Sequence, residues 1–100
     1  MVVVSLTTRT YEAASDLLKV LSAPARLAIV VELAEQPRLV NELVDRLDLS
    51  QPLVSQHLRI LRGARLVSVE RQGREAVYSL VDHHVAHIVA DAIHHGKEQS

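Results

Sequence analysis

Apolar residues recur every three to four positions through the first two thirds of the chain. This spacing occurs in residues 11–21, 24–36 and 39–47, and again in residues 51–62 before Gly63. A repeat of this length places the apolar side chains on one face of a helix. The pattern therefore predicts four amphipathic helices.

Local residues indicate where these helices begin. Pro24 and Pro52 each fit the first turn of a helix, where the backbone amide needs no partner. Ser50 can accept a hydrogen bond from an amide of the first turn. Only Asp48-Leu49-Ser50 separates the third and fourth predicted helices, so the two are expected to form a helix-turn-helix.

After Gly63 the spacing changes. Residues 66–69 and 76–80 are short apolar runs around Gln72-Gly73-Arg74, and the glycine supplies the positive φ that a tight turn needs. We expect a β hairpin here, followed by a last helix with Asp82 as its N-cap. The predicted fold is mainly α with a small β hairpin, a winged helix-turn-helix.

The composition is typical of one folded domain. The chain has 100 residues, of which 48% are hydrophobic and 23% charged, with no Phe or Trp. We expect a single domain over residues 1–100 with an aliphatic core and with residues 1–9 flexible.

The absence of cysteine excludes disulfides and thiolate sites. No apolar run has the length of a membrane span, so we expect a cytoplasmic protein with no membrane partner. We also expect no small organic substrate.

The net charge of −1 is unevenly distributed, because arginines are concentrated in residues 59–74. In a helix-turn-helix the start of the second helix enters the major groove, where Gln, Ser, His and Arg can bond base edges or phosphates. Double-stranded operator DNA is therefore the expected partner. The expected DNA-binding residues are Gln51, Ser55, Gln56, His57, Arg59 and Arg62 in the fourth helix and Arg71, Gln72 and Arg74 at the hairpin tip.

Histidines are concentrated in the last nineteen residues, which hold five of the six in the chain. If this segment is one helix, His84 and His95 are about 20° apart around the axis but about 16 Å apart along it. One chain cannot bring both to one ion, whereas two antiparallel copies related by a two-fold axis can. Asp82 and His84 of one chain with His95 and Glu98 of the other would supply two nitrogens and two oxygens, a set compatible with tetrahedral zinc.

Two other interpretations account for the same residues. Asp82 could serve only as a helix cap, and the histidines could only favour the negative end of the helix dipole, which would leave a DNA-binding regulator without metal sensing. A small zinc hydrolase would need an open ligand position for water, and four protein ligands leave none. No nucleophile motif or phosphate loop occurs either, so we do not expect an enzyme.

Three segments of the chain match a known family. They are Leu-Ser-Ala-Pro-Ala-Arg-Leu-Ala-Ile at 21–29, Leu-Val-Ser-Gln-His-Leu-Arg-Ile-Leu at 53–61 and Gly-Arg-Glu-Ala-Val-Tyr-Ser-Leu at 73–80. Together they resemble the ArsR/SmtB family of bacterial metal-sensing repressors, and the likeness runs from residue 11 to residue 98. The resemblance implies a homodimeric winged helix built on the first and last helices, which binds operator DNA without metal and releases it when metal binds.

The resemblance also implies a ligand set. Family members that sense through the last helix use an Asp-x-His pair from one chain and a His-x-x-Glu or His-x-x-His pair from the other, matched here by Asp82, His84, His95 and Glu98. Glu98 in the last place resembles the zinc sensors, while His87 on the same stripe leaves nickel or cobalt open through a higher coordination number. The cysteine pair of the family's other site has no counterpart here, so thiolate sensing of arsenic or cadmium is not expected.

Overall fold

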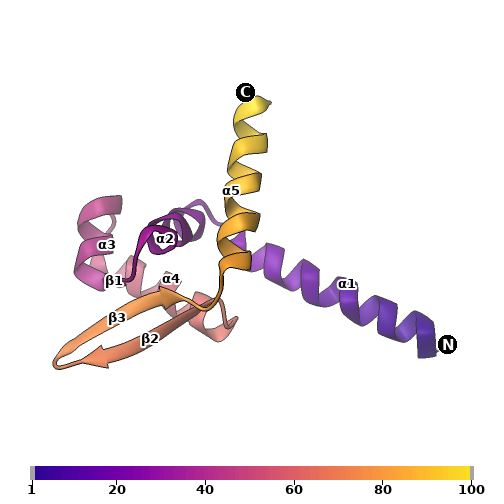
Figure 1. The fold of residues 1–100 in the computed structure, drawn as a ribbon, viewed down its shortest axis with the longest axis horizontal. Coiled ribbons are helices and arrows are strands. Elements are labelled where there is room, and N and C mark those ends of the chain that lie inside the picture. The colour runs from indigo at the N-terminus through magenta and orange to yellow at the C-terminus, as the bar shows by residue number, and fades with distance from the viewer. Residues whose placement is uncertain (1, 100) are drawn as a thin grey trace.

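The computed structural model describes residues 2–99 (Figure 1). The helices and strands follow the predicted order, with one short strand added. They are α1 (Val2–Leu21), α2 (Pro24–Glu35), β1 (Arg38–Leu39), α3 (Val40–Leu47), α4 (Gln51–Gly63), β2 (Val67–Gln72), β3 (Glu75–Leu80) and α5 (His83–Glu98). The predicted mainly α fold with a β hairpin is confirmed.

Most predicted boundaries agree with the structure to within one or two residues, but α1 does not. It begins at Val2 and not at residue 11, because the apolar spacing used to place its start is absent from the more N-terminal turns. The flexibility expected for residues 1–9 stays a prediction, and Met1 lies outside the described residues.

The hairpin is part of a three-stranded antiparallel sheet in the order β1-β3-β2. β2 and β3 pair from Val67 with Leu80 to Gln72 with Glu75. Gly73 turns the chain at the tip with φ of 67°, as predicted. β1 adds two residues to the free edge of β3, and this strand was not predicted.

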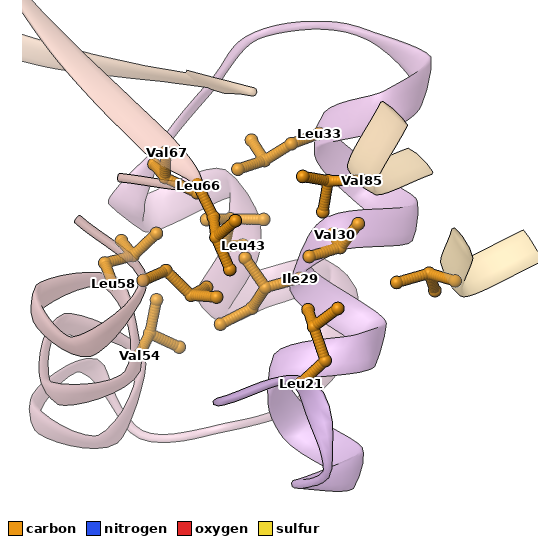
Figure 2. Close-up of a cluster of buried hydrophobic side chains, with 12 residues drawn as sticks. Leu21, Ile29, Val30, Leu33, Leu43, Val54, Leu58, Leu66, Val67 and Val85 are labelled. Carbon is orange, nitrogen blue, oxygen red and sulfur yellow. The ribbon is translucent and has the colours of Figure 1, made fainter. Parts of the chain in front are cut away.

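The core lies where α2, α3, α4, the base of the hairpin and α5 meet. Figure 2 shows the aliphatic side chains of these elements pointing toward one another, with Ile29 and Val30 of α2 at the centre. Both are fully buried, as are Leu43 of α3 and Val54 of α4. Val85 joins α5 to this cluster. The core is aliphatic, as predicted, and it holds the α3–α4 pair and the hairpin in fixed positions.

Arg38 is a buried cation that the sequence pattern did not reveal. Only 4% of its surface is exposed, and its Nη2 lies 3.3 Å from Glu32 Oε1 and 3.0 Å from Glu35 Oε1. Arg46 of α3 also pairs with Glu32, and this hydrogen bond and charge raise the pKa of Arg46. The four side chains therefore tie the end of α2 to β1 and α3.

Candidate functional site

The turn between α3 and α4 has the geometry of a helix-turn-helix. α3 ends at Leu47, and the following residue, Asp48, caps it in the left-handed conformation with φ of 53°. Two residues later, the Ser50 hydroxyl accepts a hydrogen bond from the amide of Leu53 at 3.3 Å. This cap fixes the start of α4, with Pro52 in its first turn. The predicted cap and short connection are both confirmed.

α4 presents a polar face to solvent. Val54, Leu58 and Leu61 are buried, so the opposite side of the helix points outward. Four of the residues expected to bind DNA are exposed and Ser55 is half-buried. The four exposed residues are Gln51, Gln56, Arg59 and Arg62. This face has the amide and guanidinium donors that recognise base edges and phosphates in a major groove.

Two residues of α4 differ from expectation. Leu53, an apolar residue within the pattern that predicted this helix, is 44% exposed, because it lies about 100° around the helix from the buried Val54. His57, expected on the DNA-reading face, is half-buried, and its Nδ1 is buried without a hydrogen-bond partner among the described residues. Only the rest of the His57 ring is therefore open to a ligand.

The hairpin forms an exposed wing beside α4. Arg71, Gln72 and Arg74 are exposed at its tip, and Arg71 Nη1 donates a hydrogen bond to the carbonyl oxygen of Arg74 at 3.3 Å. This bond holds the tip in a compact turn. The wing also carries the exposed carboxylates of Glu70 and Glu75 next to these arginines, and their negative charges offset part of the positive charge of the tip.

The first half of the expected metal site is assembled at the start of α5. Asp82 Oδ1 accepts a hydrogen bond from the backbone amide of His84 at 2.9 Å, which confirms Asp82 as the N-cap. The same oxygen lies 3.5 Å from Nδ1 of the His84 ring. The carboxylate and the imidazole thus lie side by side, and both are exposed, Asp82 by 49% and His84 by 89%.

The second half is only partly brought together. His95 and Glu98 are both exposed in the last turns of α5, but Glu98 Oε1 lies 3.4 Å from Nε2 of His94, not beside His95. In a helix, residues four apart are about 40° apart around the axis and residues three apart about 60°. Glu98 therefore reaches His94 more directly within one chain.

A single chain does not gather a full ligand set. Within residues 2–99, no three His, Asp or Glu side chains converge on a point where an ion could sit. Val85 and Val89 bury one face of α5, and the expected ligands lie on the opposite, exposed edge together with His87 and Asp91. All of them are accessible to a second molecule.

α1 and α5 share an apolar hollow next to that edge. In Figure 1, α1 runs away from the body and α5 rises beside its base, on the side opposite the wing. The hollow between them has a volume of about 210 Å³ and is lined almost entirely by apolar residues, namely Leu18, Leu21, Ser22, Leu27, Ile88, Val89 and Ala92. Leu18 is 57% and Tyr11 69% exposed.

Within residues 2–99, no helix is both long enough and apolar enough to cross a membrane.

Comparison with known proteins gives a consistent match. The family model for bacterial regulatory proteins of the arsR family matches residues 23–69, which hold α2, β1, α3, α4 and the start of β2. The HTH-type transcriptional repressor SmtB of Mycobacterium tuberculosis is 56% identical over 89 residues, covering 89% of this chain and 66% of that protein. The chain thus corresponds to slightly less than two thirds of this relative's length.

A second relative and two solved structures agree. The HTH-type transcriptional regulator NmtR of M. tuberculosis is 41% identical over 80% of this chain and 67% of that protein. The solution structure of apo-NmtR superposes with a TM-score of 0.76 at 36% identity, covering 91% of this chain and 76% of that one. Reduced HlyU from Vibrio cholerae has a TM-score of 0.78 at 32% identity, over 84% and 88% of the two chains. The chain therefore belongs to the arsR family of bacterial regulatory proteins, which are transcriptional regulators and not enzymes.

Proposed function

We propose that this protein is a transcriptional repressor that binds operator DNA as a homodimer in the metal-free state and releases it when zinc binds between the two α5 helices. The observation that carries the metal part is the exposed Asp82–His84 pair, with Oδ1 and Nδ1 3.5 Å apart, on the same edge of α5 as His95 and Glu98. Binding to an operator would place the protein in the cytoplasm.

The DNA-binding part is supported by the α3–α4 pair and the wing. Gln51 and Gln56 are exposed on α4 and can reach base edges when the helix enters a major groove, and the exposed Arg59 can reach the DNA backbone. Arg71 and Arg74 at the wing tip can reach the neighbouring minor groove or its phosphates. The M. tuberculosis relative at 56% identity is named a transcriptional repressor, which supports the same activity here.

The homodimer is supported by the apolar surface of α1 and α5. Among the side chains of α1 that the structure describes, those of residues 8–21, only Leu21 and the half-buried Leu17 and Val20 pack in the core. A second copy packed on the hollow beside Leu18 would cover this surface. If the two-fold axis of the dimer is perpendicular to α5, both halves of the interface are equal, the two α5 helices run antiparallel, and two ligand edges lie opposite each other.

The donor set fits zinc. Two imidazoles and two carboxylates are ligands that zinc accepts in a closed tetrahedral site, and all four side chains are exposed in the single chain. Glu98 would leave His94 to join His95 in binding. When bound, zinc would supply one cation shared by side chains of both chains. His87 on the same edge could add a ligand for nickel or cobalt, which prefer more than four ligands.

The effect on DNA follows from where the ligands lie. Asp82 and His84 follow β3 closely in one chain, and His95 and Glu98 come from the other chain. Bringing the two pairs onto one ion would therefore change the orientation of the two chains relative to each other. The distance between the two α4 helices depends on that arrangement, and an operator with fixed half-site spacing is sensitive to it. Coupling between binding sites is reciprocal, so DNA should weaken zinc binding by the same factor.

A metal-independent regulator of the same family is the second candidate. The hydrogen bond from the His84 amide shows that Asp82 already has a structural role as a cap. On this alternative, the histidines of α5 bind no ion tightly, and control of DNA binding comes from another signal. Zinc stoichiometry separates the two candidates.

We expect native mass spectrometry to detect a homodimer with two zinc ions, because two-fold symmetry makes two equal sites. His95→Ala should remove both ions, while His83→Ala, at an exposed residue off the ligand edge, should keep both. A wild-type dimer that carries no zinc after loading and desalting would favour the metal-independent regulator, and a monomer would contradict the shared site.

A further inference from the structure

A hollow of about 450 Å³ lies between α4 and β3, lined by Ser55, Arg59, Arg62, Gly63 and Tyr78. We propose that it seats one phosphate of the DNA backbone, held by the guanidinium groups of Arg59 and Arg62 and by the phenol hydroxyl of Tyr78. The inference rests on the proposed DNA binding and adds to it a specific contact, with Tyr78 as a DNA-binding residue that lies outside the recognition helix and the wing tip.

The chemistry of the lining indicates an anion. Two arginines face the hollow and none of its lining residues is acidic. Among residues 2–99, the two guanidinium groups and the Tyr78 hydroxyl have no hydrogen-bond or ion-pair partner. Arginine and phenol donors bond well to phosphate oxygens, so three unpaired donors at the edge of one hollow form a binding site for a phosphate.

The position of the hollow indicates which phosphate. The sugar-phosphate backbone of a duplex separates a major groove from the neighbouring minor groove. With α4 in the major groove and the wing at the adjacent minor groove, one strand must cross the gap between them. The hollow is lined by residues of α4 and by Tyr78 of β3, so it lies between the helix and the wing, where that strand would cross.

Tyr78 is suited to a fixed contact. Its ring is half-buried and packs against the core, and its backbone pairs with Arg38 of β1 and Val69 of β2. The hydroxyl is therefore held on a rigid support. Gly63 keeps one side of the hollow open, because it carries no side chain. The partial negative charge at the end of α4 opposes an anion there, and two full positive charges outweigh it.

The test measures, by fluorescence anisotropy at several salt concentrations, binding of the protein to a labelled duplex from upstream of its own gene. Affinity falls as salt rises, and Arg62→Ala should reduce the steepness of log affinity against log salt by about 0.9 for each α4 helix bound to the duplex, because one phosphate contact is lost. Tyr78→Phe should weaken binding by about tenfold for each half-site with the slope unchanged, because it removes one hydrogen bond to a charged group. Lys19→Ala, which removes a cation from α1, is the matched control and should change neither.

A methylphosphonate scan of the duplex adds a test of position. Replacing single phosphates by a neutral group should weaken wild-type binding, and at one position in each half-site the loss should be smaller in Arg62→Ala, where only Arg59 and Tyr78 remain to hold that phosphate. Thermal unfolding of each variant checks that the fold is intact.

The outcomes separate this inference from the proposed function. Wild-type protein that binds no duplex would contradict both. Wild-type protein that binds DNA, with Tyr78→Phe and Arg62→Ala indistinguishable from it, would contradict only the phosphate contact. Saturable micromolar binding of inorganic phosphate to the free protein, lost in Arg62→Ala, would assign the hollow to a free anion and overturn the DNA assignment.

Discussion

Mixing two zinc-binding mutants, His84→Ala and His95→Ala, is expected to restore a zinc site that neither mutant has alone. In each mutant homodimer, both sites lack one histidine, and we expect zinc affinity to fall by more than about 100-fold, since loss of an outer partner of a ligand alone costs 10–100-fold. In the mixed dimer, the intact Asp82–His84 pair of one chain faces the intact His95–Glu98 pair of the other. The second site of that dimer lacks both histidines.

The measurement is zinc stoichiometry after co-refolding equal amounts of the two mutants. Random pairing makes half of the dimers mixed, each with one intact site, so the mixture should bind about one quarter as much zinc tightly as the wild type. Refolding each mutant alone is the control. Absence of tight zinc in the mixture would show that the ligands do not come from both chains, even if each single mutant binds poorly.

Replacing Arg38 by Ala should lower the free energy of unfolding by about 3 kcal/mol, because removing one partner of a buried ion pair leaves the other charges without compensation. Glu32 is only 15% exposed and would depend on Arg46 alone. Urea unfolding followed by circular dichroism measures the change. The hydrogen bond from Arg38 Nε to the Glu32 carbonyl oxygen at 3.2 Å would be lost too.

Arg46→Ala serves as the matched control. Its side chain is 47% exposed, so Glu32 keeps the buried partner Arg38 and solvent screens the loss. We expect a much smaller change than for Arg38→Ala. Equal destabilisation by the two substitutions would contradict the view that burial makes Arg38 the central residue of this network.

The sequence predicted best those helices and strands in which an apolar pattern continues along the whole element. α2, α3, α4 and β3 were placed within one or two residues, because each buries a continuous face and is bounded by Pro, Ser or Gly, whereas β2 ends three residues beyond its apolar run. β1 could not be predicted in this way. Two residues cannot show an alternating pattern, and the strand exists only because β3 offers a free edge.

Single side chains were harder to predict than elements. Arg38 looks like a surface residue in sequence, and its burial depends on Glu32 and Glu35 being one turn apart on α2. The pairing of Glu98 with His94 depends on the choice of rotamers in one chain. The sequence did place Asp82 beside His84, because a helix cap fixes a side chain through a local backbone hydrogen bond.

The most direct test of metal-released repression is the affinity of the protein for the DNA fragment upstream of its own gene, measured by fluorescence anisotropy with chelator and then with zinc. We expect tight binding with chelator and release on adding zinc in the wild type, with His95→Ala bound under both conditions. Wild-type protein that binds the fragment equally well with chelator and with zinc would contradict zinc-controlled repression and leave a metal-independent regulator.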